Sequence, residues 1–248
     1  MMGEEIIIGK NPVMEALQSG RSVNKVIISN QLNKKTEREI RNAVKNANTI
    51  LQKAPIQRID QLSKGRHQGI IAYVSAYEYS TVQAILNRAT EKEELPFIII
   101  LDEIEDPHNL GAILRTADAT GVHGVIIPKR RAVGLTETVA KTSAGAIEHI
   151  PVARVTNIAN TIDQLKENNI WIVGTDEEGT QDYRTLDGET ALALVIGNEG
   201  KGISRLVKDK CDWMIHIPMK GSIPSLNASV ATSLLMYEIY RKRNVLGE

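Results

Sequence analysis

From Phe97 onward, short apolar runs rich in β-branched residues alternate with helix-like stretches, and no other feature of the chain limits its fold as strongly. The runs are FIIIL (97–101), GVIIP (124–128), WIVGT (171–175), LALVIG (192–197) and WMIHIP (213–218). Helices are expected at about 110–120, 135–148, 157–168 and 203–210, and a last one over about 225–243. This alternation predicts an α/β domain over residues 96–248, with a parallel sheet covered on both faces.

Residues 1–75 are expected to form a separate, smaller α/β unit. KVIIS (Lys25–Ser29) and GIIAYV (Gly69–Val74) are typical of strands, and the stretch over 33–53 is typical of a helix. This part carries 12 Lys or Arg against 6 Asp or Glu, whereas residues 76–248 carry 18 against 24. The asymmetry indicates a polyanion as the partner of the first unit, with ordinary variation of surface charge as the alternative. Residues 76–95 are expected to be a linker with some helix.

Four basic residues within the expected helix of the first unit lie at spacings of four, three and four. They are Lys34, Arg38, Arg41 and Lys45. Such spacings place side chains on one face of a helix. The stripe is either a solvated face or a surface that meets phosphates.

The segment DPHNLGAILRTADATG (106–121) opens a helix with an apolar face. Asn109 is a candidate N-cap. Arg115 lies off the apolar face, and Gly111 and Ala112, one turn back, leave it room to fold toward Asn109. Together they would form a donor cluster suited to a phosphate or an oxyanion. The alternative is a surface pair of Arg115 with Asp118.

Two later segments combine glycines and polar residues at the ends of strands. A nucleotide-binding G-x-G-x-x-G after the first strand is absent, and the glycine-rich turn is instead Gly197–Gly202, which holds Glu199. A ligand is therefore expected late in the domain, at the carboxyl ends of strands.

The segment IPMKGSIPSLNASVA (217–231) follows the last strand. Pro224 favours a helix start there, which would put Ser225 and Asn227 in the first helical turn. An apolar stripe continues along this helix through Leu226, Val230, Leu234 and Tyr237. Small residues beside the stripe, Ala228, Ser229, Ala231 and Thr232, offer more packing surface than one neighbour needs.

Composition excludes several classes of protein. The single cysteine, Cys211, excludes an intrachain disulfide and a cysteine-rich zinc site, and the five histidines show no ligand spacing, so no metal is expected. No apolar run approaches the ~20 residues that span a bilayer, and the opening MMGEEIIIGKNP is unlike a signal peptide. A cytoplasmic protein without a membrane partner is expected.

The three segments at 106–121, 195–203 and 217–231 closely resemble the three motifs of the SpoU/TrmH family, RNA ribose 2′-O-methyltransferases of the SPOUT class. The opening IIIGKNPVMEAL and the run HQGIIAYV resemble the family's substrate-binding domain, which is similar to large-subunit ribosomal proteins. Within the family, the full-length match is closest to the bacterial 23S rRNA guanosine-2′-O-methyltransferases of the RlmB type. The resemblance implies a deep trefoil knot in the second domain, a homodimer formed through it, and RNA as the partner.

The resemblance also implies the site residues. The catalytic set would be Asn109, Arg115, Glu199, Ser225 and Asn227. S-adenosylmethionine would bind in the knot at Gly197, Ile217 and Leu226, with Gly174, Thr175, Ile196 and Met219 nearby. The family assigns Arg115 the role of base, but an arginine side chain normally stays protonated in proteins, so phosphate binding and electrostatic stabilisation are the alternative role.

Three other functions compete with the one that this resemblance implies. A non-catalytic RNA-binding assembly factor predicts a damaged cofactor turn or loss of Arg115, and an ordinary dinucleotide oxidoreductase predicts an early glycine fingerprint. Neither pattern is present. A tRNA ribose methyltransferase fits the same motifs as an rRNA enzyme, so the sequence leaves that alternative open.

Overall fold

The computed structural model describes residues 5–19, 21–75, 77–177, 179–222 and 225–245. It divides the chain into two compact units. The first comprises residues up to Glu78 together with 134–137, and the second comprises 79–133 and 138 onward. Residues 79–95 thus differ from the expected linker: α4 (Val82–Glu91) is capped by Thr81 and buries Ile85 in the core of the second unit.

The first unit contains a mixed sheet in the order β1-β4-β2-β3. These strands are β1 (Glu5–Ile8), β2 (Val23–Ser29), β3 (Ile50–Ala54) and β4 (Ile70–Val74). Only the β2–β3 pair is parallel. Apolar residues of α1 (Lys10–Gln18) and α2 (Lys34–Asn46) pack on one set of sheet residues, and α3 (Ile56–Leu62) packs on another. The helices therefore cover both faces of the sheet.

The helix expected over 33–53 is wrong in its second half. α2 ends at Asn46, and the chain then turns through Asn48, whose φ is 49°. Ile50 and the following residues pair with β2 instead of continuing the helix. Asparagine tolerates the left-handed region better than most residues, so the turn is the physical reason for the break.

The second unit is built on a parallel sheet, as the alternating pattern predicts. Its order is β7-β6-β5-β10-β8-β11-β9, and every pair in it is parallel. The strands are β5 (Phe97–Leu101), β6 (Gly124–Pro128), β7 (Val152–Val155), β8 (Trp171–Thr175), β9 (Gln181–Asp182), β10 (Leu192–Ile196) and β11 (Trp213–His216). Strands β7 and β9 have no counterpart in the sequence prediction. β9 is only two residues long, and β7, VARV, is a four-residue run interrupted by an arginine.

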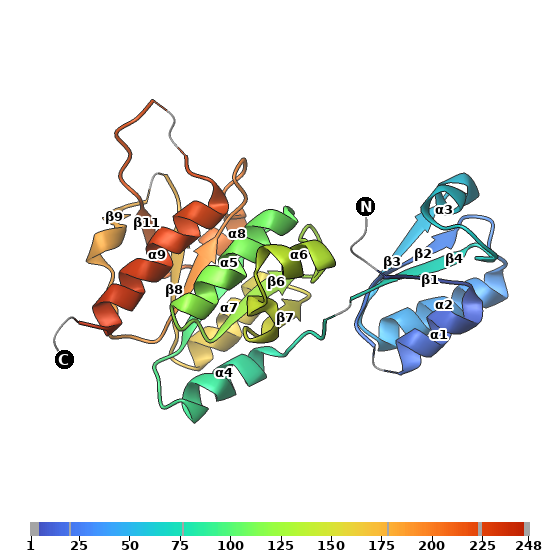
Figure 1. The fold of residues 1–248 in the computed structure, drawn as a ribbon, viewed down its shortest axis with the longest axis horizontal. Coiled ribbons are helices and arrows are strands. Elements are labelled where there is room, and N and C mark those ends of the chain that lie inside the picture. The colour runs from blue at the N-terminus through green and yellow to red at the C-terminus, as the bar shows by residue number, and fades with distance from the viewer. Residues whose placement is uncertain (1–4, 20, 76, 178, 223–224, 246–248) are drawn as a thin grey trace. The chain divides into compact units, whose positions relative to one another are not determined.

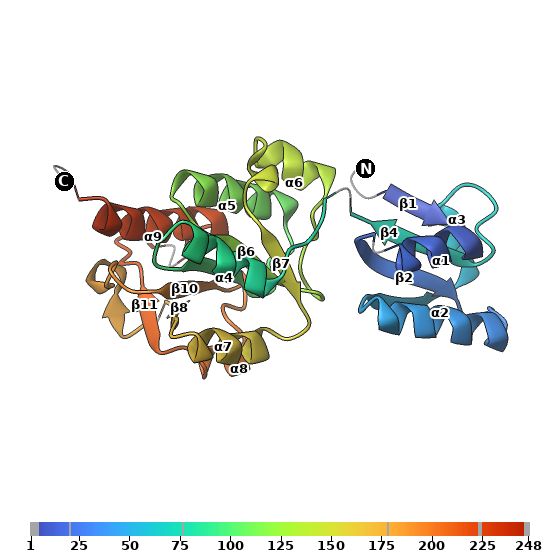
Figure 2. The ribbon, with the colours of Figure 1, turned by 90° about the horizontal axis from the view of Figure 1, so that it is seen from below.

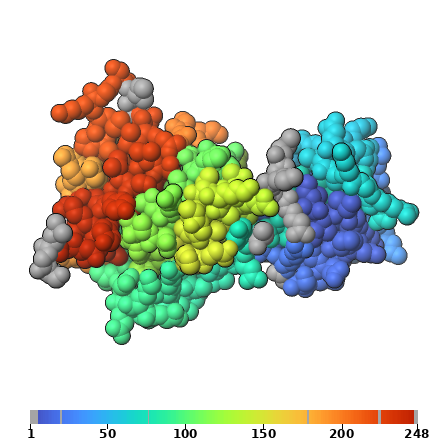
Figure 3. Space-filling view, in the orientation of Figure 1, coloured from blue at the N-terminus to red at the C-terminus, as the bar shows by residue number. Residues whose placement is uncertain are grey.

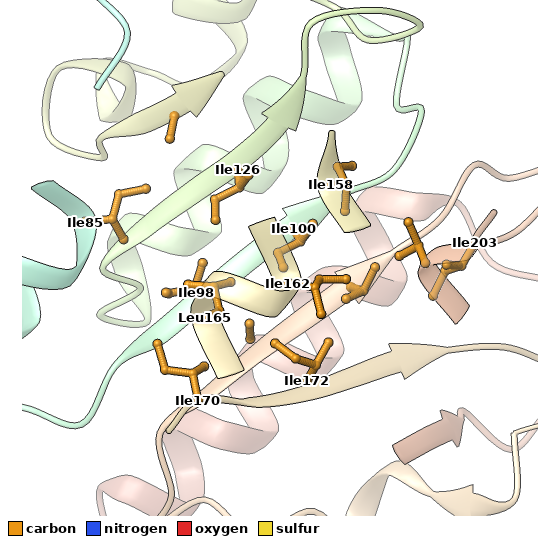
Figure 4. Packing of buried hydrophobic residues seen from close by; sticks show 14 residues of the cluster. Ile85, Ile98, Ile100, Ile126, Ile158, Ile162, Leu165, Ile170, Ile172 and Ile203 are labelled. Atoms are coloured by element: carbon orange, nitrogen blue, oxygen red, sulfur yellow. The ribbon is translucent and has the colours of Figure 1, made fainter. Parts of the chain in front are cut away.

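Helices cover both faces of this sheet. α5 (Pro107–Ala119) and α9 (Ala228–Arg243) lie side by side on one face, and α7 (Ile158–Glu167) and α8 (Arg205–Lys208) lie on the other (Figures 1 and 2). Figure 4 shows part of the core, where Ile162 and Leu165 of α7 lie against Ile98, Ile100 and Ile172 of the strands. Full burial of such side chains contributes about 1.5–3 kcal/mol each.

The two last long strands are inserted between strands that precede them in the chain. β10 lies between β5 and β8, and β11 lies between β8 and β9. The carboxyl ends of β8, β10 and β11 consequently meet at one edge of the sheet, although long stretches of sequence separate them. The knot implied by the family resemblance stays a prediction.

Several helix boundaries differ from expectation. The stretch 135–148 is broken into α6 (Glu137–Thr142) and a 3₁₀ turn (Ala146–Glu148) because Ala144 and Gly145 adopt positive φ angles of 51° and 92°. α8 occupies only 205–208 of the expected 203–210. The final helix begins at Ala228 rather than about 225, and Pro224, which suggested the earlier start, lies outside the described residues.

Candidate active site

A cavity of about 740 Å³ opens at the carboxyl ends of β8, β10 and β11. Three chain segments form most of its wall, namely 175–177, 196–202 and 215–219. Residues before α9 and in its first half complete it: Gly221, Ser225, Leu226, Ala228, Ala231 and Leu235. The cavity therefore lies late in the domain, where the glycine-rich turn predicted a ligand, and its volume is typical of small-molecule sites.

Glu199 connects two asparagines at the edge of this cavity. Its Oε1 accepts hydrogen bonds from Asn109 Nδ2 at 3.1 Å, from Asn227 Nδ2 at 2.6 Å and from the backbone N–H of Ala228 at 2.9 Å. Asn227 Nδ2 also donates to Asn109 Oδ1 at 2.9 Å. Three residues from three distant segments thus form one polar cluster, named the Asn–Glu–Asn cluster below.

The helix starts hold both asparagines in position, but Asn109 is not the helix N-cap that the sequence predicts. Asp106, rather than Asn109, caps α5, because its carboxylate accepts from the N–H of His108 and Pro107 occupies the first turn. Asn109 therefore lies inside the helix and is only 6% exposed. Its side chain is free to bind Glu199.

Asn227 is the N-cap of α9. Its Oδ1 accepts from the backbone N–H groups of Ser229 and Val230, while its Nδ2 reaches Asn109 and Glu199. Both ends of one amide are thus used, one for the helix and one for the cluster. Ser225 lies before the helix, exposed at the cavity wall, and not in a helical turn.

Arg115 is exposed on α5 and has no hydrogen bond or ion pair with any residue that the structure describes. Neither the expected approach to Asn109 nor the alternative pair with Asp118 is found. The small residue one turn back has another role, because a Cβ on Gly111 would collide with the Thr142 side chain at the end of α6. Gly111 permits close helix packing within the unit, and Arg115 stays available at the surface.

The loop that carries Glu199 closes on itself. The backbone of Asn198 exchanges hydrogen bonds with Gly202, N to O at 3.1 Å and O to N at 2.7 Å. A Cβ on Gly197 would collide with the backbone of Gly202 and Ile203. A larger residue at 197 would therefore distort the loop itself, in addition to any ligand it would displace.

Six of the seven residues expected at the cofactor line the cavity. They are Thr175, Ile196, Gly197, Ile217, Met219 and Leu226. Gly174 is the exception: a Cβ there would meet the side chains of Met214 and Cys211, so this glycine packs against protein rather than facing the cavity. Cys211 is partly buried, and desolvation of its thiol raises its pKa to about 12, which makes it a packed residue rather than a reactive one.

Asp176 and His216 also line the cavity, although no sequence motif points to them. Asp176 follows β8 and accepts from Lys208 Nζ at 2.7 Å, and His216 Nδ1 lies 2.8 Å from the carbonyl of Gly179. Both residues stand at the carboxyl ends of strands, and that position alone was the available signal.

The predicted basic stripe lies on α2. All four side chains are exposed. Arg41, however, donates to Glu37 Oε1 at 2.9 Å, and Lys53 Nζ lies 2.7 Å from the same oxygen. These two cations lower the pKa of Glu37, with Lys53 as the larger cause. The Arg41 charge is therefore partly balanced, whereas Lys34, Arg38 and Lys45 have no ion pair among the described residues.

In the part of the chain that the structure describes, no group of three or more His, Cys, Asp or Glu side chains is placed to hold a metal ion. No helix there has the length and apolar character needed to cross a membrane.

Comparison with known proteins identifies both units. Residues 96–237 match the model of the SpoU rRNA Methylase family, and residues 6–80 match the model for RNA 2′-O ribose methyltransferase substrate binding. A Bacillus subtilis protein, YacO, named for the TrmH family of tRNA/rRNA methyltransferases, is 55% identical over 244 residues, covering 98% of both chains.

Solved structures agree with the sequence matches. The SpoU methyltransferase AviRb of Streptomyces viridochromogenes, in complex with the cofactor AdoMet, aligns with a TM-score of 0.62 at 29% identity, covering 97% of this chain and 91% of that one. An AdoMet-bound rRNA methyltransferase of Sinorhizobium meliloti has the same fold, with a TM-score of 0.61 at 22% identity and coverage of 98% and 88%. The chain thus belongs to the SpoU rRNA methylase family and is an RNA methyltransferase with the family's substrate-binding domain at its amino-terminal end.

Proposed function

We propose that this protein transfers the methyl group of S-adenosylmethionine to a ribose 2′-hydroxyl of RNA, and that the target is a guanosine of 23S rRNA. The Asn–Glu–Asn cluster carries this proposal, because it joins polar side chains from all three motif segments, and its member Glu199 lines the cavity. The substrate-binding domain over residues 6–80 supports RNA as the substrate.

The cavity fits the cofactor chemically. S-adenosylmethionine carries a sulfonium and an ammonium group, and Asp176, Glu177 and Glu199 supply carboxylates at the wall. Ile196, Ile215 and Leu235 supply apolar surface beside the loop backbones. AviRb, which has the same family fold, binds AdoMet. When bound, this cofactor supplies an electrophilic methyl group.

The residues of the chain then have to align the ribose and manage its proton. A ribose hydroxyl is a weak nucleophile at neutral pH, so alignment contributes much of the acceleration. We assign ribose orientation to Ser225 and Asn227, with Glu199 and Asn109 fixing the Asn227 amide. Arg115, exposed and unpaired among the described residues, binds an RNA phosphate and stabilises negative charge on the 2′-oxygen. Its alternative role is that of the base.

The substrate has one competing assignment. The B. subtilis relative bears a name that covers both tRNA and rRNA, and tRNA is the alternative substrate here. The positive charge of the substrate-binding unit suits either RNA, and the presence of this unit as a separate domain favours rRNA. An rRNA substrate also assigns the enzyme to the cytoplasm.

A methyl-transfer assay tests the proposal. In vitro, the purified enzyme is incubated with labelled S-adenosylmethionine and either 23S rRNA or total tRNA. Separately, 2′-O-methyl sites are mapped in RNA from cells with and without the protein. We expect label in 23S rRNA and one guanosine site that disappears with the gene. Label confined to tRNA would show that tRNA, not 23S rRNA, is the substrate. Absence of transfer to either RNA would contradict the proposed methyltransferase function.

We also propose that the enzyme is a homodimer formed through α9. Val230, Leu234 and Tyr237 on this helix are 48%, 43% and 51% exposed. The buried face of α9 is a different one, formed by Ala228, Thr232, Leu235, Met236 and Ile239. Figure 3 shows the surface of α9, in red, beside that of α5, in green. The expected apolar stripe is thus left for a second copy.

A further inference from the structure

The side chain of Asn198 ties the loop over 197–204 to the chain that follows β5. Its Nδ2 donates to the carbonyl of Glu103 at 3.1 Å, and its Oδ1 accepts from the N–H of Gly200 at 2.9 Å. With the two backbone bonds to Gly202, Asn198 makes four hydrogen bonds in all. It is half-buried, and it immediately precedes Glu199.

The acceptor of this bond is itself held in an unusual conformation. Glu103 has a φ of 64°, which residues other than glycine adopt only when their surroundings impose it. Its carboxylate accepts from Arg131 Nη1 at 2.9 Å, in the segment after β6. A neighbouring bond joins the same two segments, since Asp102 Oδ2 accepts from the N–H of Ser204 at 2.8 Å.

The two ends of the loop are thus fixed differently. Ser204 is held at the far end by the buried Asp102 carboxylate. At the end that bears Glu199, the backbone N–H of Asp102 donates to the Ile196 carbonyl at 2.8 Å, and the Asn198 amide adds the side-chain bond to Glu103. Because a peptide bond joins Asn198 to Glu199, any shift of Asn198 moves the Glu199 carboxylate relative to Asn109 and Asn227.

We propose that Asn198 is a positioning residue: its Nδ2 bond to Glu103 keeps Glu199 in the Asn–Glu–Asn cluster and keeps the loop wall of the cavity in place. This inference rests on the proposed methyltransferase function for its catalytic readout. Asn198 itself touches neither the ribose nor the methyl group, and it acts through Glu199.

Two substitutions separate the donor from the rest of the side chain. Asn198→Asp keeps an oxygen for the Gly200 N–H but loses the donor and places a carboxylate against the Glu103 carbonyl. Asn198→Ala loses both side-chain bonds. Asn157→Ala is the matched control, because Asn157 also bonds a backbone N–H, that of Asn160 at 3.1 Å, but caps α7 away from the cavity.

Each protein is measured for binding of S-adenosylmethionine by calorimetry, for kcat and KM with RNA, and for thermal stability. We expect both Asn198 variants to bind the cofactor about tenfold more weakly and to lose up to ~10²-fold in kcat, since small misplacements near a reacting centre have such effects. The KM for RNA should stay within about twofold. The control should lose stability while its cofactor affinity and kcat match the wild type.

Outcomes for the two proposals are distinguishable. If the wild type binds S-adenosylmethionine and methylates RNA but Asn198→Asp equals it in affinity and kcat, the positioning role is wrong. If the control Asn157→Ala loses cofactor affinity and kcat to the same extent as Asn198→Asp at an equal loss of thermal stability, the positioning role is also wrong. If the wild type neither binds the cofactor nor methylates RNA, the proposed function itself fails.

Discussion

At the scale of single residues, the three polar members of the cluster differ sharply from Arg115. Asn109, Glu199 and Asn227 are fixed by one another, whereas Arg115 is exposed and forms no ion pair with the described residues. A residue with no internal partner contributes little to folding. The exposed guanidinium of Arg115 is therefore the group on α5 that is most readily available to bind RNA.

Replacing Arg115 should separate catalysis from stability. We expect Arg115→Ala to lose ~10²–10³-fold in methyl transfer, which is typical of removing one preorganised donor, while thermal stability and cofactor affinity remain near wild type. Arg184→Ala is a suitable control, because Arg184 pairs with Asp182 at the edge strand β9. Single-turnover transfer and calorimetry measure both effects, and normal turnover by Arg115→Ala would remove this residue from the mechanism.

His123 gives the second unit a defined response to acid. It is 1% exposed, its Nδ1 accepts from the N–H of Phe97 at 3.0 Å, and its Nε2 then carries the proton toward Glu94, also at 3.0 Å. Burial lowers the pKa of His123 below its ordinary value of 6.5, although Glu94 acts in the opposite direction. The folded protein consequently binds fewer protons than the unfolded chain just below pH 6.5.

The stability held by neutral His123 is therefore complete above pH 6.5 and falls as the pH drops below that value toward the lowered pKa. We expect the free energy of unfolding to decrease between pH 7 and pH 5, and the slope to flatten in His123→Gln, whose amide cannot titrate. His149→Gln, at an exposed histidine, should keep the wild-type slope. Urea unfolding across this range is the measurement, and equal slopes for the two variants would contradict the assignment.

At the scale of elements, α2 and α9 show how one helix can present two different faces. α2 buries Ile40 and Val44 and exposes its basic stripe. α9 buries one apolar face and exposes a second. A second exposed face of one chemical kind, basic on α2 and apolar on α9, is typical of surfaces that meet partners.

The α2 stripe should contribute to RNA binding through phosphate contacts. Neutralising Lys34, Arg38, Arg41 and Lys45 to Gln should weaken RNA binding and flatten its dependence on salt, since each phosphate contact adds about 0.7–0.9 to the slope. Cofactor affinity should not change. Arg41→Gln alone should have a smaller effect than Lys45→Gln because Glu37 already balances its charge. An unchanged slope in the fourfold variant would leave the stripe a solvated face.

At the scale of the whole molecule, the apolar face of α9 predicts assembly. A stable two-fold contact buries at least ~1,200 Å², and each copy offers Val230, Leu234 and Tyr237 to it. We expect light scattering to give a dimer for the wild type and a monomer with reduced turnover for Leu234→Lys. Leu206→Lys is the control, since Leu206 is 60% exposed on α8, on the other side of the sheet. A fully active wild-type monomer at assay concentration would exclude a shared site.

Local sequence patterns predicted most of the elements and the polar residues at their ends. The β-branched runs predicted the long strands of the parallel sheet, and the three polar segments predicted where a ligand site would form, because periodicity and turn chemistry are local properties. Boundaries failed where one residue in a left-handed conformation redirected the chain, as at Asn48 and Ala144. Short strands such as β9 carried too few residues for a pattern.

Which distant groups meet depends on the three-dimensional fold. Asn109 lies 90 residues from Glu199 and 118 from Asn227, and their hydrogen bonds depend on β10 entering the sheet beside β5 and on α9 packing against α5. The local sequence could not show that Gly111 leaves room for the Thr142 side chain, or which apolar face of α9 is buried. These facts follow from the order in which strands are inserted, and that order is set by the packing of the whole domain rather than by any one segment.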